Sequence, residues 1–315
     1  MKIVVTGALG HIGSRLIREL PALVPGAEIV LIDDFSAQRY CSLFGLPKEG
    51  RYRFHELDVT KADLKPLISG ADVVFHLAAI TNAAGSFENK AAVENGNFEG
   101  TRRVAEACLA AGARLVYLSS TSVYGTQADV VDEDCTEAEL QPQSPYAETK
   151  LREERLVAEL GGRGLEFIAF RFGTIFGTSP GMRFHTAVNK FCWQASVGQP
   201  ITVWRTAYEQ KRPYLDLEDA MRAFRMVLDK KLFDRRLYNV LTANLTVRDI
   251  VDTIRRRVPD LKIEFVDAKI MNQLSYEVLD ARFRAQGYRP AGSVERGVFD
   301  TLDLLGGGRL SPSNA

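Results

Sequence analysis

The residues with the clearest chemical potential are a tyrosine, a lysine and a serine near the middle of the chain. Tyr146 and Lys150 are four positions apart, so a helix places both side chains on one face. An ammonium group beside a phenol favours the phenolate, which lets a tyrosine act as a general base near neutral pH. Ser120 ends an apolar run upstream and can hydrogen-bond to the same substrate oxygen. We interpret the pair as catalytic rather than as a surface contact, because Tyr146 is the only one of the ten tyrosines with a lysine four residues later.

A strand, a glycine-rich turn and a helix are predicted in that order at the start of the chain. Residues 1–5 form an apolar run typical of a buried parallel strand, and residues 14–20 have helical spacing. Of the intervening glycines, Gly7 permits a tight turn, Gly10 lets a pyrophosphate approach the backbone, and Gly13 lets the helix pack closely. The helix N-terminus offers free N–H groups to phosphates. The motif therefore predicts a dinucleotide site; a tight connection without a ligand is the alternative.

The second predicted strand, residues 28–32, ends in two acidic residues. Asp33 lies twenty positions after Gly13, where an acidic side chain accepts hydrogen bonds from the adenosine ribose hydroxyls. A carboxylate there repels a 2′-phosphate, so the expected cofactor is NAD rather than NADP. Asp34 is adjacent, and the sequence does not separate the two roles.

Strands and helices alternate through the first half of the chain. The further strands expected are residues 51–57, 72–77, 114–118 and 165–170, and the helices are residues 62–68, 91–111 and 144–160. Ser144 is a candidate N-cap and Pro145 occupies the first helical position. Residues 126–143 are polar and are expected to form a surface loop. The alternation predicts an α/β fold with a Rossmann-type, doubly wound parallel sheet.

The pattern changes after Arg171, where turn-rich sequence interrupts the alternation. The strands expected there are residues 201–204, 236–241 and 263–266, and the helices are residues 186–197, 219–230, 246–258, 275–286 and 293–305. This mixture predicts a smaller α+β substrate-binding lobe. We divide the chain into a cofactor-binding domain, residues 1–172, and a substrate lobe, residues 173–315, with about residues 214–241 returning to the first domain. The tail from Gly306 is expected to fray.

The composition is that of an ordinary soluble globular protein, with 46% hydrophobic and 25% charged residues among 315. Forty basic and forty acidic residues cancel, so nothing indicates a nucleic-acid or acidic-membrane partner. No apolar run approaches the length of a membrane helix, and the role of the first strand argues against a cleaved leader. The four cysteines and four histidines are scattered. We therefore expect a cytoplasmic protein with reduced thiols and no metal site.

These motifs together resemble the extended short-chain dehydrogenase/reductase family, in its nucleotide-sugar epimerase and dehydratase branch, with UDP-glucose 4-epimerase as the general pattern. Besides the glycine motif and Asp33, the resemblance is carried by DVT at 58–60, HLAA at 76–79, NFEGT at 97–101, SSTSVYG at 119–125, PYAETK at 145–150, RFGTIFG at 171–177 and KRPYLDLEDA at 211–220. It fades after about residue 245. It implies a tightly bound NAD, a UDP-, dTDP- or GDP-linked sugar substrate, and a homodimer formed by the helices at 91–111 and 144–160.

The resemblance also implies the members of the site. The catalytic residues are Ser120, Tyr146 and Lys150. The cofactor-binding residues are Gly7, Gly10, His11, Ile12, Gly13, Asp33, Asp34, Asp58, Val59, Leu77, Ala78, Ala79, Asn97, Tyr146, Lys150 and Phe172. The substrate-binding residues are Ser120, Thr121, Thr174, Arg183, Trp204 and Arg212. Arg212 is expected to contact the substrate diphosphate through bidentate geometry. Trp204 falls where the family lines the nucleobase pocket, with a buried core tryptophan as the alternative.

Two departures from the family pattern bear on the substrate. Thr174 stands where the family often has asparagine, and residues 269–272 contain no Arg-x-x-Asp clamp. The sugar or its nucleotide therefore need not be those of UDP-glucose. Arg183 and His185 are candidates to supply replacement phosphate or sugar contacts; the alternative is that they only hold their loop.

Four reactions of the family compete, and the residues after Ser120 help to separate them. The 4,6-dehydratases that resemble this chain carry an Asp-Glu pair there, and the decarboxylases usually carry a glutamate, whereas this chain has Thr121 and Ser122. The 4-keto reductases usually use NADPH, which Asp33 disfavours. A 4-epimerase needs only the triad: hydride passes from C4 to NAD, the ketose rotates, and hydride returns to the other face.

We therefore expect 4-epimerisation of a nucleotide-linked hexose, with the other three reactions as alternatives. A carboxylate from elsewhere, such as Asp129 or Glu133, would revive the dehydratase reading if it reached the site. A non-catalytic, dinucleotide-sensing regulator is the alternative of another class, and the intact triad argues against it.

Overall fold

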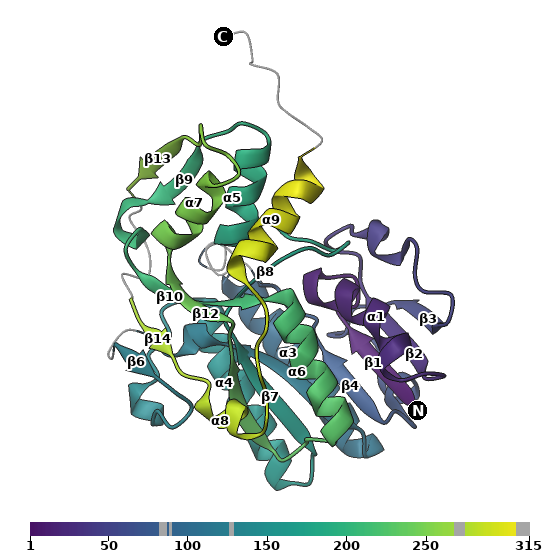
Figure 1. Ribbon diagram of the computed structural model, residues 1–315. Coiled ribbons are helices and arrows are strands. Elements are labelled where there is room, and N and C mark those ends of the chain that lie inside the picture. The colour runs from purple at the N-terminus through teal and green to yellow at the C-terminus, as the bar shows by residue number, and fades with distance from the viewer. Residues whose placement is uncertain (82–86, 88–89, 126–128, 268–274, 307–315) are drawn as a thin grey trace.

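A seven-stranded parallel sheet dominates the computed structural model, which describes residues 1–81, 87, 90–125, 129–267 and 275–306 (Figure 1). In spatial order its strands are β11 (Arg236–Val240), β7 (Phe167–Phe172), β5 (Arg114–Ser120), β4 (Val73–His76), β1 (Lys2–Thr6), β2 (Glu28–Asp33) and β3 (Arg51–Glu56). The chain order reverses between β1 and β4, which is the point where doubly wound sheets bind ligands. The expected Rossmann-type fold is confirmed.

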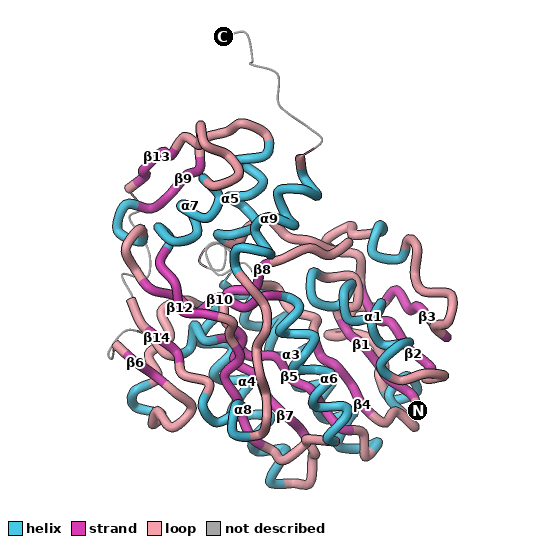
Figure 2. The backbone as a smooth tube through the Cα atoms, in the orientation of Figure 1, coloured by secondary structure: helices cyan, strands magenta, loops and turns pink. Residues whose placement is uncertain are grey.

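Helices cover both faces of this sheet and create two separate cores (Figure 2). One face packs on α1 (His11–Leu23) and α6 (Leu217–Lys230); the other packs on α2 (Lys65–Ile68), α3 (Lys90–Ala111) and α4 (Pro145–Gly162). Successive strand residues point to opposite faces, so Ile3 and Val5 join the first core and Val4 joins the second. Burial on both faces explains why these strands are continuously apolar.

A smaller lobe is built on a third core. Its helices are α5 (Ala187–Ser196), α7 (Val247–Arg255) and α9 (Val294–Leu305), and its strands β9 (Ile201–Trp204) and β13 (Ile263–Val266) pair in parallel. A three-stranded sheet of β12 (Ala243–Thr246), β10 (Lys211–Asp216) and β8 (Thr174–Phe176) lies between this lobe and the large sheet. We keep residue 172 as the proposed boundary, with residues 214–241 in the larger domain, because α6 packs on α1 and β11 extends the large sheet.

The helix expected at residues 275–286 is wrong in its first half. There β14 (Glu277–Val278) pairs with β6 (Val130–Val131), and only α8 (Ala281–Ala285) is helical. Tyr276 and Val278 are buried with a period of two, and the Glu277 N–H donates to the Asp129 carbonyl. Pairing with a distant strand therefore overrides the local preference for a helix.

The surface loop expected at residues 126–143 contains β6 and the 3₁₀ helix η3 (Glu137–Glu139). The other described 3₁₀ helices are η1 (Tyr40–Leu43), η2 (Thr121–Val123) and η4 (Arg205–Ala207). The start of α4 is confirmed, since the Ser144 hydroxyl accepts a hydrogen bond from the Ala147 N–H and Pro145 follows it. The tail predicted to fray from Gly306 is described only at Gly306 itself, because residues 307–315 lie outside the described residues. The stretch 269–272 also lies outside them.

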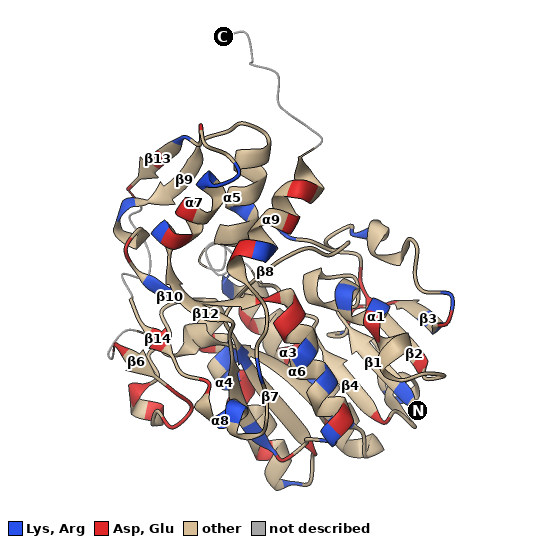
Figure 3. Ribbon diagram, in the orientation of Figure 1, with Lys and Arg blue, Asp and Glu red and all other residues tan. Residues whose placement is uncertain are grey.

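Lysine and arginine are interspersed with aspartate and glutamate over both lobes (Figure 3). In the part of the chain that the structure describes, no helix is long and apolar enough to cross a membrane. The same residues contain no group of three or more histidine, cysteine, aspartate or glutamate side chains placed to hold a metal ion.

Candidate active site

Two adjoining cavities lie at the carboxyl ends of the parallel strands and share Leu77, Ala78 and Ala79. The first cavity is lined by Gly7, Leu9, Gly10, Ile32, Asp33, Asp34, Ser36, Ala37, Arg39, Leu57, Asp58, Val59, Thr60, Ile80, Gly96, Asn97 and the shared residues. The second is lined by Ile12, His76, Thr81, Leu118, Ser119, Ser120, Thr121, Ser122, Tyr146, Lys150, Phe172, Gly173, Thr174, Ile175, Arg183, Thr186, Arg212, Pro213, Tyr276 and the shared residues. The shared segment follows β4, so it joins the two halves of the site.

The glycine turn after β1 lines the first cavity and has no room for side chains at two of its glycines. Gly7 has φ +65°, and a Cβ there would lie 2.6 Å from the Ala78 nitrogen. A Cβ on Gly13 would lie 2.3 Å from the Gly7 carbonyl oxygen, so the start of α1 packs directly on the turn. Gly10 faces the cavity, where a side chain would fill the space beside the helix N-terminus. The turn, the close packing and the exposed backbone fit the dinucleotide phosphates expected at this motif.

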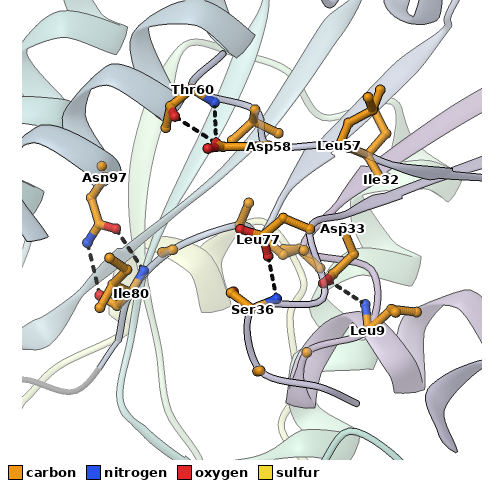
Figure 4. Close-up of a pocket in the computed structure, with 18 of the residues that line it drawn as sticks. Leu9, Ile32, Asp33, Ser36, Leu57, Asp58, Thr60, Leu77, Ile80 and Asn97 are labelled. Carbon is orange, nitrogen blue, oxygen red and sulfur yellow. Dashed lines mark hydrogen bonds between the residues drawn. The ribbon is translucent and has the colours of Figure 1, made fainter. Parts of the chain in front are cut away.

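Asp33 is fixed at the end of β2 on the wall of the first cavity (Figure 4). Its two carboxylate oxygens accept hydrogen bonds from the Leu9 N–H at 3.0 Å and the Phe35 N–H at 3.1 Å. Burial raises the pKa of this carboxyl group, an effect that the two backbone donors oppose. Asp34 accepts from the Ser36 N–H at 2.9 Å and lines the same wall. Both acidic residues are therefore held where an adenosine ribose is expected.

The opposite wall of the first cavity is also rigidly held (Figure 4). The Asn97 amide donates to the Ile80 carbonyl at 2.9 Å and accepts from the Ile80 N–H at 2.7 Å. Asp58 accepts from the backbone and the hydroxyl of Thr60, and the hydroxyl bond lowers the pKa of this carboxyl group. Asn97 therefore positions the segment after β4, and Asp58 fixes the turn after β3.

The predicted triad comes together on the second cavity. Ser120 ends β5, Tyr146 begins α4, and Lys150 lies one turn further, with its Nζ 6.0 Å from the centre of the Tyr146 ring. The Lys150 ammonium donates to the Leu118 carbonyl and to a carboxylate oxygen of Glu153, both at 3.0 Å. Burial lowers the pKa of Lys150, but Glu153, Tyr146 and Glu154 together oppose burial more strongly, so the net shift is upward. The lysine therefore stays charged beside the tyrosine.

The second cavity carries positive charge and, among its described residues, no carboxylate. Lys150, Arg183 and Arg212 line it, whereas every aspartate and glutamate of the described site lies elsewhere. The Glu133 carboxylate accepts from the Asn239 N–H at 2.7 Å, and neither Glu133 nor Asp129 lines the cavity. The carboxylate that a dehydratase reading requires is therefore not found in the described part of the site.

Arg183 lines the second cavity half-buried, and no described aspartate or glutamate forms an ion pair with it. Its Nη1 donates to the Thr81 hydroxyl, and its Nε has no hydrogen-bond partner among the described residues. Burial lowers the pKa of this arginine, the charge of Arg39 lowers it further, and the neighbouring Tyr146 opposes both. A half-buried guanidinium that no described carboxylate balances is suited to an anionic ligand.

Three of the predicted site residues line neither cavity: His11, Gly13 and Trp204. His11 is buried beside the Ser179 hydroxyl, 2.8 Å away, and burial lowers its pKa to about 3. Trp204 ends β9 with 38% of its surface exposed, so it is neither a core residue nor a wall of the cavity. Ile12 and Phe172, expected at the cofactor, line the second cavity. His185 lines neither cavity.

Sequence reasoning missed Arg39, Thr81, Tyr276 and Glu153. Arg39 lines the first cavity within electrostatic range of Asp33, and Thr81 holds Arg183. The Tyr276 hydroxyl donates to the Thr121 carbonyl at 3.2 Å and so closes the second cavity from the far end of the chain. Arg39, Thr81 and Tyr276 lie in loops, and no spacing rule connects them to the motifs. Glu153 alone carried a signal, because it lies one helical turn after Lys150.

Comparison with known proteins gives the family. The model of the NAD dependent epimerase/dehydratase family matches residues 3–240. The chain belongs to this family. NAD is the cofactor of the family, in agreement with the shape of the glycine turn and the place of Asp33. The resemblance to nucleotide-sugar epimerases and dehydratases is thereby confirmed.

The chain is similar along nearly its whole length to several relatives. It is 31% identical to a Bacillus subtilis (strain 168) protein described as an uncharacterized UDP-glucose epimerase, over 97% of this chain and 98% of that one. It is 30% identical to a trifunctional UDP-glucose 4,6-dehydratase, 3,5-epimerase and reductase of Arabidopsis thaliana over 96% of this chain and 46% of the plant protein. The chain therefore spans about half the length of this plant relative.

Solved structures share the fold. A UDP-glucuronic acid 4-epimerase from Bacillus cereus, in complex with UDP-glucuronic acid and NAD, has a TM-score of 0.86 and 26% identity over 97% of this chain and 99% of that one. MoeE5, in complex with UDP-glucuronic acid and NAD, has a TM-score of 0.83 and 27% identity over 96% of this chain and 98% of that one.

The charge of Asp33 is predicted to set the choice of cofactor. Replacing Asp33 by asparagine removes the repulsion of a 2′-phosphate and keeps the shape of the side chain. Titration calorimetry is expected to show NAD bound far more tightly than NADP by the wild type, and a preference at least about tenfold smaller in the variant, or roughly 1.4 kcal/mol. Equal affinity of the wild type for both dinucleotides contradicts the assignment.

Proposed function

We propose that this protein interconverts two nucleotide-linked sugars that differ in configuration at C4. The observation that supports this most strongly is the second cavity, where Ser120, Tyr146 and Lys150 meet without a described carboxylate, next to a cavity that fits NAD. NAD held by the glycine turn and Asp33 would supply a reversible hydride acceptor for C4. The net reaction then consumes no cofactor and expels no part of the substrate.

The protein residues supply the proton transfer and the binding. Tyr146 takes the proton of the C4 hydroxyl during oxidation and gives it back during reduction, while Ser120 hydrogen-bonds to the same oxygen. The Lys150 ammonium stabilises the phenolate and remains in place through both steps. Arg212, which lines the same cavity, is suited to the substrate diphosphate because a guanidinium binds phosphate oxygens bidentately.

The same cavity argues against water elimination. A 4,6-dehydratase must remove a proton at C5 and protonate the leaving hydroxyl at C6, and unactivated hydroxyl groups are too weakly acidic and basic for that work. Thr121 and Ser122 occupy the positions after Ser120, and Asp129 and Glu133 lie outside the cavity. The dehydratase activity in the name of the plant relative is therefore not carried over.

We propose further that the sugar is a uronic acid, with a carboxylate at C6. Arg183 is a half-buried cation within electrostatic range of Tyr146, and among the described residues its buried Nε has no hydrogen-bond partner and no carboxylate is paired with it. A substrate carboxylate would compensate this charge, and the C6 group is attached to C5, the ring carbon next to the reacting C4. The two structural neighbours that were solved with UDP-glucuronic acid support the same choice.

The assembly and location follow from the family resemblance. We propose a homodimer formed through α3 and α4, which pack side by side over one face of the large sheet and carry exposed polar residues. We also propose a cytoplasmic protein, with its four cysteines free.

Tyr146→Phe is predicted to stop turnover while leaving NAD bound, because it removes the proton acceptor and little else. The expected loss of kcat is about 100- to 10,000-fold, the range of general acid–base catalysis. Stopped assays of epimer formation and fluorescence titration with NAD check the two parts. A variant that keeps a near-normal rate removes Tyr146 from the mechanism.

The reaction class is tested with a panel of nucleotide sugars. We expect a product with the mass of the substrate, identified as the C4 epimer by NMR, and no growth of NADH absorbance during turnover. Chromatography coupled to mass spectrometry follows the product directly. Loss of one water or one carbon dioxide, or net formation of NADH, identifies another reaction of the family.

Arg183→Met tests the uronic acid. We expect kcat/KM for UDP-glucuronic acid to fall at least about 30-fold, or roughly 2 kcal/mol, the loss typical of a buried charge pair. Any turnover of UDP-glucose should be affected much less. Arg225→Met, at an exposed arginine of α6, is the matched control and should leave both rates unchanged. An equal loss with both sugars, or none with either, argues against a substrate carboxylate at Arg183.

A further inference from the structure

A carboxylate lies directly behind the lysine of the triad. Glu153 is completely buried, and its Oε2 accepts three hydrogen bonds: from Lys150 Nζ at 3.0 Å, the Thr101 hydroxyl at 2.7 Å and the Tyr117 hydroxyl at 2.9 Å. The other oxygen, Oε1, is buried with no partner among the described residues. Glu153 does not line either cavity, so it cannot touch the reacting atoms.

Three elements meet at this carboxylate. Lys150 and Glu153 lie on one face of α4, Thr101 comes from α3, and Tyr117 comes from β5. With Oε2 saturated by three donors, the carboxylate has little freedom to move. The lysine is fixed further by its bond to the Leu118 carbonyl, which leaves one ammonium N–H uncommitted among the described contacts.

A chain of hydrogen bonds connects Glu153 to the segment shared by the two cavities, and each donor in it points toward Glu153. Thr101 donates its hydroxyl proton to Glu153, so its oxygen accepts from His76 Nε2, 3.1 Å away. His76 Nδ1 then accepts from the Thr6 hydroxyl at 2.8 Å, and Thr6 accepts from the Ala78 N–H at 3.4 Å. Burial lowers the pKa of His76 to about 3, which keeps the imidazole neutral. A neutral ring donates from Nε2 and accepts at Nδ1, so the order of donors in this chain of hydrogen bonds is fixed.

We propose that Glu153 is a positioning residue for the reaction, whose carboxylate keeps the Lys150 ammonium charged and aimed at Tyr146 and links it to the backbone of the shared segment. The ionisable groups around the lysine are few. They are Glu153, Glu154 and Tyr146 on its own helix, Tyr117 on β5 and His76 on β4. Glu154 also raises the Lys150 pKa, but it is engaged in a bidentate pair with Arg171, so Glu153 is the carboxylate that bonds the lysine directly.

Glu153→Gln tests the proposal, because it removes the charge and keeps the size. The Lys150 pKa should fall once the Glu153 charge, which opposes burial most among the neighbouring groups, is removed, so the lysine loses its proton at lower pH. We therefore expect the alkaline limb of the kcat/KM profile to move to lower pH by about one unit or more, the scale of close ion-pair effects. We also expect kcat at neutral pH to fall roughly 10- to 100-fold, as for a catalytic group misplaced by ~1 Å, with KM little changed.

The kinetic arm rests on the proposed function, so a second arm measures the lysine without substrate. In protein labelled with ¹³C at lysine, the Lys150 Cε resonance, assigned by its absence in Lys150→Arg, should titrate at lower pH in Glu153→Gln than in the wild type. A shift in this titration without any epimerase activity supports the role of Glu153 and rejects the proposed reaction. An unshifted titration rejects the role of Glu153, whatever the reaction.

Two further variants complete the test. Glu264→Gln, at an exposed glutamate of β13 outside both cavities and the proposed dimer helices, should leave both profiles unchanged. Glu153→Asp keeps the negative charge and shortens the reach, so it should retain the wild-type alkaline limb with a reduced kcat. If Glu153→Gln does not fold, the aspartate variant decides: a limb moved to lower pH in that variant overturns the proposal, and so does a wild-type kcat.

Discussion

The active site depends on keeping one ammonium group charged where water hardly reaches. Lys150 is almost fully buried, and an isolated ammonium in that position would lose its proton. The Glu153 carboxylate prevents this, and it is itself held by donors from α3 and β5. The sheet, the two helices and the triad are therefore coupled through one ion pair.

The charges on the cavity side of Lys150 indicate the substrate and the reaction, in addition to the ion pair with Glu153 on its other side. The second cavity combines Lys150, Arg183 and Arg212 with no described carboxylate, so it suits an anionic substrate and lacks the groups that deprotonate carbon. Removal of a hydride to NAD and of one hydroxyl proton to Tyr146 needs no further acid or base. The lack of a described carboxylate in this cavity therefore favours both an anionic substrate and epimerisation over water elimination.

The sequence predicted the parts of the site that are local in the chain. The glycine turn, Asp33 and the Tyr146–Lys150 pair each depend on a few consecutive residues, and the structure places them as the motifs require. The failures are non-local. Residues 277–278 pair with a strand that lies 147 positions earlier in the chain, which no helical periodicity can reveal, and the neighbouring Tyr276 reaches the site beside that pairing. Trp204 was assigned by resemblance alone, and the course of β9 takes it away from the cavity.

The central claim is that the hydride removed from C4 returns to C4 within a single binding event. A nucleotide sugar carrying deuterium at C4, incubated with the enzyme in ordinary water and followed by NMR, tests this most directly. The account predicts that the epimer retains deuterium at C4 and that a parallel reaction in heavy water introduces none at C5. Loss of the C4 label, or deuterium at C5 from the solvent, would contradict internal hydride return.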